Sequence, residues 1–552
     1  MTTTPAASEP SGVGRASALL ASGTLVSRLL GFVSALVLAQ TLTTRGAGAN
    51  TFALANQLPN NIYAIVAGGV LSAILVPQIV RAGLHNDGGQ KFINRIITLG
   101  GVVFISAAAI ATICAPLLVR LYTTQQTAGS SRGFSEGDLA LATAFAYWCL
   151  PQILFYALYS LFGEVLNARK VFGPFTWAPV VNNVVAITGL LIFNVLFSSV
   201  DVENAASWTS PMIAVIAGSA TLGVAAQALV LVFFWRKAGL SYRPEFKWRG
   251  VGLGRVGKAA GWTFGMIIVG QIAGIVQTQV ASQAGADGTS LAALRYAWLI
   301  FMLPHSIVTV SIATAYFTRM STHVRDSDLA SLRRDISSSL RTIGLVMVFA
   351  TVTLIVIAYP FSRVFTSTGF EETQAMGNVL IAYLPGLIPF TILFVLQRTF
   401  YSLEDTRTPF FIQVAQSALF IAGALIVQGL PPESIAVGVA AVTTLAGTAQ
   451  MIIAFVVLRK RLNGFDGRHI IRQYLVYLLA TVPAALAGIA LAAGLGAFVG
   501  GFAVASITTA IATMAVVGVA MLVIYVATLA LLRTPELRAL LAPVVSRLRG
   551  HR

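Results

Sequence analysis

The sequence predicts an all-α polytopic membrane protein, and three observations support this fold class. The 552-residue chain contains about fourteen apolar stretches of roughly 20 residues, the length that an α-helix needs to cross the hydrocarbon core of a bilayer. Hydrophobic residues make up 57% of the chain and charged residues only 10%, which leaves too little polar surface to cover a water-soluble body of this size. The positive charges fall almost entirely in every second gap between the apolar stretches.

The apolar stretches and the charges between them give a predicted topology. We expect transmembrane helices near residues 18–40, 52–78, 96–118, 138–163, 176–197, 210–235, 259–283, 292–318, 340–361, 377–400, 409–429, 434–458, 472–497 and 503–532. About 30 of the 36 Lys and Arg residues lie in the two tails and the even-numbered gaps, and about 5 in the odd-numbered gaps. Because cytoplasmic loops carry the excess of positive charge, both tails are predicted to be cytoplasmic, as an even number of spans requires.

The net charge of +17 does not indicate a nucleic-acid partner. Topology and attraction to an anionic inner leaflet explain charges that follow the cytoplasmic loops. Cys114 and Cys149 both lie in predicted spans, so we expect neither a disulfide framework nor a metal site. The first apolar segment is too long for a signal-peptide core and is predicted to be a retained helix. Residues 1–16, rich in small and polar residues, are predicted to be a disordered cytoplasmic tail.

No motif for covalent chemistry, a cofactor or a metal withstands inspection. The segment Gly252-Leu-Gly-Arg-Val-Gly257-Lys258 matches a phosphate-binding loop in part, but Ala259 stands where a Ser or Thr should hold magnesium, and no strand precedes it. We interpret this match as a coincidence in a basic loop that contacts anionic headgroups or fixes topology. The sequence therefore predicts a transporter without a cofactor rather than an enzyme.

An internal repeat predicts two six-helix lobes. Two segments of similar sequence lie six spans apart, namely Leu58-Pro59-Asn60-Asn61-Ile62 and Leu303-Pro304-His305-Ser306-Ile307. The prolines Pro151 and Pro174 recur in the same way as Pro385 and Pro409. Such repeats are typical of two bundles that rock about a shared central site, although proline also recurs in transmembrane helices without a repeat.

The repeat divides the chain into predicted domains. We expect an N-lobe of six helices at residues 17–236 and a C-lobe of six helices at 237–458. Two further helices at 459–532 and a cytoplasmic tail at 533–552 follow.

Arg28 is the most informative candidate for a binding site. It lies about ten residues into the first span, roughly 15 Å along the helix and so close to the middle of the membrane. A charge at this depth costs at least about 2.5 kcal/mol and should face a polar cavity or pair with an anion. The guanidinium group suits phosphate because its donors meet two oxygens at once, whereas snorkelling or pairing with helix carbonyls is the structural alternative.

Other polar residues inside the spans either line the same cavity or join neighbouring helices. They are Asn50, Asn60, Asn61, Gln271, Gln277, Gln279 and His305. His305 is in addition a candidate for a switch linked to protonation, with a structural role as the alternative. Arg398, near the end of the tenth span, is predicted to pair with Glu404 or Asp405.

Several segments resemble one family, the MurJ (MviN) lipid II flippases of the multidrug/oligosaccharidyl-lipid/polysaccharide exporter superfamily. The similar segments are Ser27-Arg28-Leu-Leu-Gly31-Phe32, Leu58-Pro59-Asn60 with Val76-Pro77, and Leu166-Asn167 with Phe172, Pro179 and Asn183. The most specific is Arg398-Thr-Phe-Tyr-Ser-Leu-Glu-Asp405-Thr-Arg-Thr408-Pro409, which is similar to the family's R-x-F-Y-[AS]-x-x-D-x-[KR]-T-P.

The resemblance implies a central cationic cavity between the lobes, which binds the pyrophosphate and sugars of lipid II, and a groove on the last two helices for its polyprenyl tail. The family's first cavity arginine falls on Arg28. Other charged positions of the family are occupied here by uncharged residues, namely Ser34, Ala35, Asn50, Tyr63, Gly68, Trp298 and Leu299. The chain therefore resembles a divergent member, of an actinobacterial type. The expected substrate-binding residues are Ser27, Arg28, Asn50, Asn60, Tyr63, His305 and Arg398.

The function implied is a flippase in the bacterial plasma membrane that moves lipid II to the outer leaflet by alternating access. The membrane potential or a coupling cation would drive it, and its partners would be lipid II, membrane lipids and cell-wall synthesis proteins. A flippase for another polyprenyl-linked polysaccharide and a non-transporting cell-wall scaffold are alternatives. A cation-coupled drug exporter is a third, but it needs an intramembrane carboxylate, and the nearest candidate, Glu164, lies at a helix end.

Overall fold

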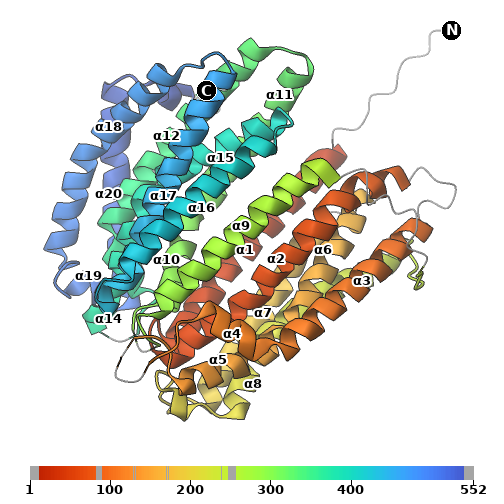
Figure 1. Cartoon of the computed structure of the whole chain (residues 1–552). Helices are drawn as coiled ribbons and strands as arrows, with labels where there is room; N and C mark the ends of the chain where they lie inside the picture. Colours follow the sequence, from red (N-terminus) through yellow and green to blue (C-terminus); the bar gives the residue numbers. More distant parts are fainter. Residues whose placement is uncertain are drawn as a thin grey trace, which may run out of the picture. The chain divides into compact units, whose positions relative to one another are not determined.

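The computed structural model describes residues 11–82, 90–127, 130, 132–169, 171, 173–237, 239–246, 257–286, 288–367 and 369–539. These residues are mostly helical (Figure 1), and their one β-type contact is an isolated bridge between Gln125 and Phe134. The predicted all-α class is therefore confirmed. Four sequence-based predictions lie outside the described residues, at positions 1–10, Phe172, 252–256 and 540–552.

The helices follow one another along the chain in two halves. In the first half of the chain they are α1 (Ser11–Leu42), α2 (Gly46–Ala82), α3 (Gln90–Ile113), α4 (Ala115–Tyr122), α5 (Glu136–Cys149), α6 (Gln152–Ala168), α7 (Gly173–Leu196), η1 (Ala205–Ser207), α8 (Ser210–Lys237) and α9 (Gly257–Ser282). In the second half they are α10 (Leu291–Pro304), η2 (His305–Thr309), α11 (Val310–Arg325), α12 (Leu329–Val356), α13 (Ala358–Arg363), α14 (Gly369–Tyr383), η3 (Leu384–Gly386), α15 (Leu387–Ser402), α16 (Arg407–Val427), α17 (Pro432–Arg461), α18 (Gly467–Gly494), α19 (Phe502–Ala505) and α20 (Ile507–Leu531). Because α1 begins at Ser11, residues 11–16 of the predicted disordered tail are helical.

Thirteen helical segments among the described residues are long and apolar enough to cross a membrane. Each of them overlaps one predicted span, with ends that differ by a few residues in most cases and by eleven at the start of α12. The remaining prediction, 52–78, falls within α2, which is not among the thirteen. The chain is therefore a polytopic membrane protein.

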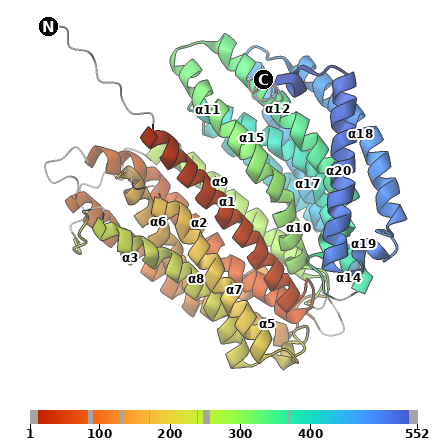
Figure 2. The ribbon, with the colours of Figure 1, turned by 180° about the vertical axis from the view of Figure 1, so that it is seen from behind.

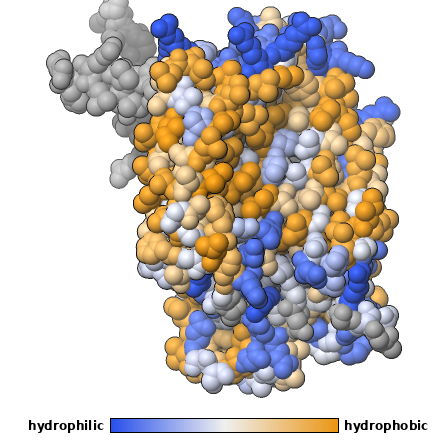
Figure 3. Space-filling model, turned by 90° about the vertical axis from the view of Figure 1, so that its left-hand side faces the viewer, coloured by the Kyte–Doolittle hydropathy of each residue, from blue (hydrophilic) through white to orange (hydrophobic). Residues whose placement is uncertain are grey.

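The exposed surface of the spans agrees with a lipid environment. Large apolar side chains along α18 and α20 are open to the surroundings, such as Leu479 at 66%, Leu486 at 64% and Val523 at 62%. On the face in Figure 3, hydrophobic side chains cover a wide band, and hydrophilic ones gather above it and in the lower part of the face. A soluble monomer rarely exposes so large an apolar area, whereas lipid chains cover it without a free-energy penalty.

The chain folds into two compact units. The first contains Met1–Leu42, Thr51–Leu121 and Glu136–Ile267, and the second contains Thr43–Asn50, Tyr122–Ser135 and Ile268–Arg552. In the first unit α7 packs against α1 and α8, and α6 packs against α3 and α8. In the second, α12, α18 and α20 lie side by side, and α17 packs against α14, α15 and α16 (Figures 1 and 2). The predicted lobes, with boundaries at residues 236 and 458, remain a prediction.

Prolines interrupt three spans that the sequence predicts as continuous helices. Pro151 lies between α5 and α6, and Pro385 lies in the 3₁₀ turn η3 between α14 and α15. Pro304 ends α10 and is followed by the π-helical turn η2. A proline has no N–H and its ring clashes with the preceding turn, which favours a break or a change of pitch at these three positions. Pro59, the repeat partner of Pro304, lies instead within the unbroken α2.

Small residues let the helices of the first unit approach closely. A Cβ atom on Gly189 of α7 would lie 2.2 Å from the Cβ and Oγ of Ser219 on α8. A Cβ atom on Gly223 of α8 would lie 2.4 Å from Oδ1 of Asn182 on α7. Close backbone approach is a main source of helix association in membranes, where apolar side chains gain little by leaving lipid.

The first prediction concerns this contact. Gly189→Leu should lower the free energy of unfolding by about 1–3 kcal/mol, because the new side chain must push α7 and α8 apart. The measurement is the thermal unfolding temperature of the purified chain in detergent. Gly518→Leu on α20 is the matched control, since nothing lies within 4 Å of the Cβ position there. Equal unfolding temperatures for the two variants would contradict the close contact.

Candidate functional site

Arg28 lies near the middle of the long helix α1, as predicted. It is separated from the C-terminal end of the helix at Leu42 by about 21 Å at 1.5 Å per residue. Its side chain is exposed, and that of the preceding Ser27 is half-buried. The guanidinium group is therefore displayed on the surface of α1 at a depth where the chain is otherwise apolar.

Asn183 of α7 fixes the part of α1 that carries Arg28. Its Nδ2 donates a hydrogen bond of 3.0 Å to the backbone carbonyl of Ser27. A Cβ atom on Gly23 would lie 2.8 Å from Nε1 of Trp177, which is too close for any larger residue without a shift, whereas one on Gly31 would make an ordinary contact of 3.6 Å with the same Nδ2. Gly23 therefore lets α1 lie close against α7. Sequence reasoning included Asn183 only as part of the resemblance, because nothing in the spacing pairs it with Ser27.

Tyr63 and Asn60 lie on α2, also in the first unit. Asn60 is exposed, and Tyr63 is half-buried with its ring centroid 5.9 Å from those of Phe104 on α3 and Tyr156 on α6. This places Tyr63 at the meeting point of three helices. The side-chain surroundings of Gly68, further along α2, lie outside the described residues.

A polar network that the sequence did not predict lies beside Tyr63. Gln152, just after the break at Pro151, donates from Nε2 to Thr221 Oγ1 at 2.9 Å and to Asn56 Oδ1 at 3.4 Å. Its Oε1 accepts a hydrogen bond of 3.2 Å from the hydroxyl of Tyr156. The network joins α2, α6 and α8, and the signal that could have revealed it is a glutamine directly after an intramembrane proline.

Asn50 belongs to the second unit, and its side chain binds backbone groups of the same unit. Its Nδ2 donates to the carbonyls of Ala286 at 2.5 Å and Gly288 at 3.1 Å, and its Oδ1 accepts from the N–H of Ala292 at 3.0 Å. The residue is fully buried. It therefore ties the start of α2 to the start of α10, and its predicted part in substrate binding stays a prediction.

Two of the predicted residues, His305 and Arg398, are linked in the second unit through one aromatic ring. His305, only 2% exposed, packs its ring 5.0 Å from that of Phe394 and 4.7 Å from that of Phe390. The Arg398 guanidinium lies 5.1 Å from the centroid of Phe394 and 5.4 Å from that of Phe317. These distances suit cation–π attraction, so Arg398 is held by ring faces.

The aromatic contacts continue to a position where the resembling family carries a charged pair. Trp298 stacks on Phe301 at 4.8 Å and meets the rings of Phe390 at 5.9 Å and Tyr383 at 5.7 Å. Trp298 and its neighbours therefore form an aromatic cluster on α10, α14 and α15 that ends at Arg398. Three glutamines on α9, Gln271, Gln277 and Gln279, are half-buried.

The predicted ion pair of Arg398 with Glu404 or Asp405 is wrong. Asp405 instead pairs with Arg461 at the end of α17 through its Oδ2. Its Oδ1 accepts the backbone N–H of Thr408 at 3.0 Å, in the first turn of α16. Burial raises the pKa of Asp405, but the hydrogen bonds of Thr408 and the charge of Arg461 outweigh burial and hold the pKa below its usual value. Among the described residues no ion pair joins Arg398 to Glu404 or Asp405, and the Arg398 guanidinium lies over the rings of Phe317 and Phe394 instead.

These contacts show that the motif from Arg398 to Pro409 marks the start of helix α16. Asp405 satisfies an N–H of the first turn of α16, and Pro409 in the same turn needs no partner because it has no N–H. The motif thus fixes the turn between α15 and α16, and Arg398 lies about one helical turn before the end of α15.

The apolar helical fold, with cationic, amide and aromatic side chains inside its spans, defines a polytopic membrane protein of the transporter class. The family profile described as "Lipid II flippase MurJ" matches residues 39–531. The chain therefore belongs to the lipid II flippase MurJ family, and the predicted family is confirmed.

Individual relatives agree with this assignment. The chain is 27% identical over 404 residues to a probable lipid II flippase MurJ of Haemophilus influenzae, covering 70% of this chain and 75% of that protein. It is 27% identical over 470 residues to the corresponding protein of Rhizobium meliloti, covering 82% and 81%. Both relatives align with most of the chain, so the likeness extends over both compact units.

Solved structures show the same fold. A lipid II flippase MurJ in an inward closed conformation aligns with a TM-score of 0.70 at 20% identity, covering 93% of this chain and 99% of that one. A multidrug resistance MATE family transporter of the MOP superfamily, in an inward-facing conformation, aligns with a TM-score of 0.62 at 14% identity, covering 79% and 94%.

The second prediction tests the ion pair between Asp405 and Arg461. Arg461→Gln and Asp405→Asn should each destabilise the chain, and the double variant should lose less than the sum, with a coupling of about 0.3–1 kcal/mol for this partly exposed pair. Thermal unfolding in detergent gives the coupling. Arg398→Gln combined with Asp405→Asn is the control cycle and should be additive. Coupling in the control cycle instead would restore the Arg398 pair.

Proposed function

We propose that this chain is a lipid II flippase, which moves the lipid-linked peptidoglycan precursor from the cytoplasmic to the outer leaflet of the bacterial plasma membrane. The observation that carries the proposal is family membership across residues 39–531, together with an arginine displayed in the middle of α1. The match begins after Arg28, so the role proposed for this cation depends on its position in the helix and not on the match. Both tails are proposed to lie in the cytoplasm because of the charge distribution.

Arg28 is proposed to hold the pyrophosphate of the headgroup. A guanidinium group donates two parallel hydrogen bonds to phosphate oxygens, and this binding is strong where water is excluded. Asn183 acts as a positioning residue, because its bond to the Ser27 carbonyl sets where α1 presents Arg28. One guanidinium neutralises only part of a pyrophosphate, so loop arginines or bound cations must contribute as well.

Transport is proposed to follow alternating access. An inward-open state admits the headgroup from the inner leaflet, Arg28 binds its pyrophosphate, and closure followed by outward opening releases it on the other side. The polyprenyl tail stays in the hydrocarbon throughout, along the groove that the family resemblance implies on the last two helices. An inside-negative potential assists, since each uncompensated negative charge moved outward gains about 2.3 kcal/mol per 100 mV.

The third prediction concerns Arg28. Cells depleted of an established lipid II flippase should grow when they express this chain, and Arg28→Ala at the same membrane level should fail to support growth. Arg28→Lys should support growth only in part, because an ammonium group keeps the charge but cannot form the bidentate hydrogen bonds that a guanidinium group makes with a phosphate. Arg243→Ala, which removes an exposed cation of the first unit, is the matched control. Full growth with Arg28→Ala would contradict the proposed site and favour a scaffold role.

The fourth prediction separates the driving forces. Collapse of the membrane potential alone should slow lipid II translocation in cells or proteoliposomes, and Glu164→Gln should leave the rate unchanged. Glu164 is half-buried in α6 and has no ion-pair partner among the described residues, so it is the carboxylate that a coupling cation would use in this unit. If Glu164→Gln abolished transport and collapse of the potential had no effect, the result would contradict potential-driven transport and support cation coupling.

A further inference from the structure

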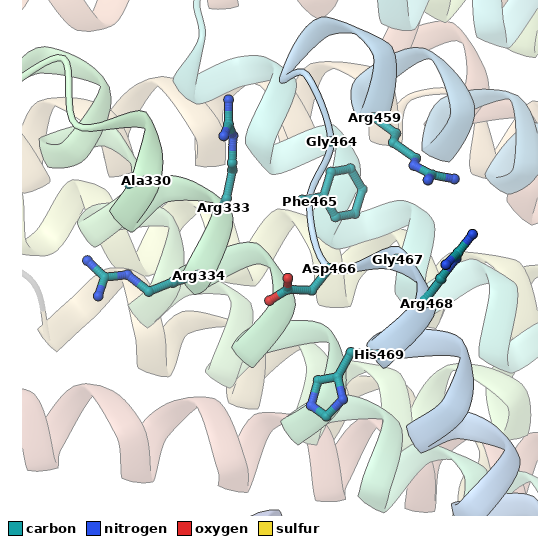
Figure 4. Close-up of a pocket in the computed structure, with 10 residues that line it drawn as sticks. All are labelled: Ala330, Arg333, Arg334, Arg459, Gly464, Phe465, Asp466, Gly467, Arg468 and His469. Atoms are coloured by element: carbon teal, nitrogen blue, oxygen red, sulfur yellow. The ribbon is translucent and has the colours of Figure 1, made fainter.

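A basic pocket lies in the second unit, and neither His305 nor Arg398 nor the aromatic cluster is among its lining residues. It has a volume of about 650 Å³ and lies where α12 begins, α17 ends and α18 begins (Figure 4). The lining residues are Ala330, Arg333, Arg334, Arg459, Gly464, Phe465, Asp466, Gly467, Arg468 and His469. Because α17 and α18 are both spans, the turn that joins them lies at a membrane surface.

The pocket carries an excess of positive charge. Four arginines and one histidine line it, against a single carboxylate, that of Asp466. Arg334 donates to the hydroxyl of Ser331 at 2.9 Å, and within the described part of the chain none of the four arginines makes an ion pair. Figure 4 shows the guanidinium groups of Arg459 and Arg468 on one side and Arg333 and Arg334 on the other. Their charges are therefore available to an anionic ligand.

A neighbouring pocket of about 410 Å³ provides an internal comparison. It is lined by Arg319, His323, Asp335 and Arg341, among others. There Asp335 pairs with Arg319 at 2.8 Å and with His323 at 3.2 Å, and Arg341 pairs with Glu536. Carboxylates of the chain itself therefore pair with these two arginines of that pocket, and the ion pairs hold its helices together. The basic pocket shares Arg334 and Asp466 with this neighbour, but its other three arginines, Arg333, Arg459 and Arg468, have no ion-pair partner within the described residues.

An apolar groove begins beside the basic pocket. It has a volume of about 360 Å³ and is lined by Ile392, Met451, Ile452, Phe455, Val456, Ile470, Ile471, Tyr474 and Leu475, from α15, α17 and α18. Ile471, Leu475 and Ile452 are 56%, 54% and 52% exposed, so the groove is open to its surroundings. These side chains lie on membrane-spanning helices, where the surrounding medium is hydrocarbon.

The pocket and the groove are parts of one surface. Arg468 and His469 line the pocket, and the next two residues of α18, Ile470 and Ile471, line the groove. The ring of Phe465 in the pocket packs 5.0 Å from that of Phe455 in the groove. A ligand that fills both must carry an anionic group at the membrane surface and an apolar chain that runs along α18 into the membrane.

We propose that this surface binds one anionic glycerophospholipid, with its phosphate in the basic pocket and an acyl chain in the apolar groove. Guanidinium groups bind phosphate oxygens through charge-assisted hydrogen bonds, and basic pockets between transmembrane helices attract anionic headgroups. A soluble phosphate would explain the arginines but not the groove beside them. The site lies on the predicted cytoplasmic side, where anionic lipids are enriched, and it is independent of lipid II transport.

The test uses the full chain purified in detergent with phosphatidylglycerol or phosphatidylcholine of identical acyl chains. Native mass spectrometry should show tighter retention of phosphatidylglycerol. Arg459→Gln combined with Arg468→Gln should weaken phosphatidylglycerol binding about tenfold or more and remove the preference over phosphatidylcholine. Ile471→Ser combined with Leu475→Ser should weaken both lipids and keep the preference.

Two controls make the outcome decisive. Arg169→Gln combined with Arg243→Gln removes two exposed cations of the first unit, so it changes the net charge equally and should leave binding unchanged. Without added lipid, all variants should unfold at the same temperature as the unmodified chain. Such agreement would show that the substitutions do not disturb the fold. Displacement of phosphatidylglycerol by millimolar glycerol 3-phosphate would overturn the proposal in favour of a soluble anion site. Equal retention of the two lipids by the unmodified chain would overturn it as well.

Discussion

The hydrocarbon core of a membrane offers no hydrogen-bonding partner to the backbone, so every amide inside it must find one within the protein. Continuous helices meet this requirement, and the interrupted spans meet it with local adjustments. Where α3 gives way to α4, the N–H of Cys114 still binds the carbonyl of Ile110 at 2.9 Å, and the N–H of Leu118 binds the carbonyl of Cys114 at 2.9 Å. Pro304 has no N–H to donate, and the π-helical turn that follows it continues the chain into α11.

The same requirement decides what polar side chains in the spans do. Threonines bind the carbonyl one turn earlier, as Thr112 does with Ala108 at 2.7 Å. Asn50 and Asn183 bind backbone groups of neighbouring helices, which fixes how those helices meet. A guanidinium group has five donors in one plane and uses several kinds of partner. Arg132 donates to the backbone carbonyls of Gln428 and Leu430, whereas Arg398 lies against aromatic faces.

Periodic apolar stretches predict the fold well because hydrocarbon thickness sets the length of a span, whereas contacts between spans leave no trace in local pattern. The span ends agree within a few residues in most cases, but α12 begins at Leu329, eleven residues before the prediction, since Arg333 and Arg334 extend it beyond the apolar stretch. The pairing of Asp405 with Arg461 could not be read from the sequence, because 56 residues separate them and Arg398 is nearer along the chain. Asn183 and Ser27, 156 residues apart, are a similar case.

Depth in the membrane distinguishes the two cationic regions of the chain. A charge near mid-membrane costs at least about 2.5 kcal/mol, so an anion reaches Arg28 only if the protein encloses it and excludes lipid. A phosphate that stays at the surface meets Arg459 and Arg468 without leaving its ordinary environment. In the proposed mechanism the first position selects a headgroup that is carried through the membrane, and in the proposed lipid site the second retains a lipid that is not. The two proposals therefore assign the same chemical group, a phosphate, to two different depths.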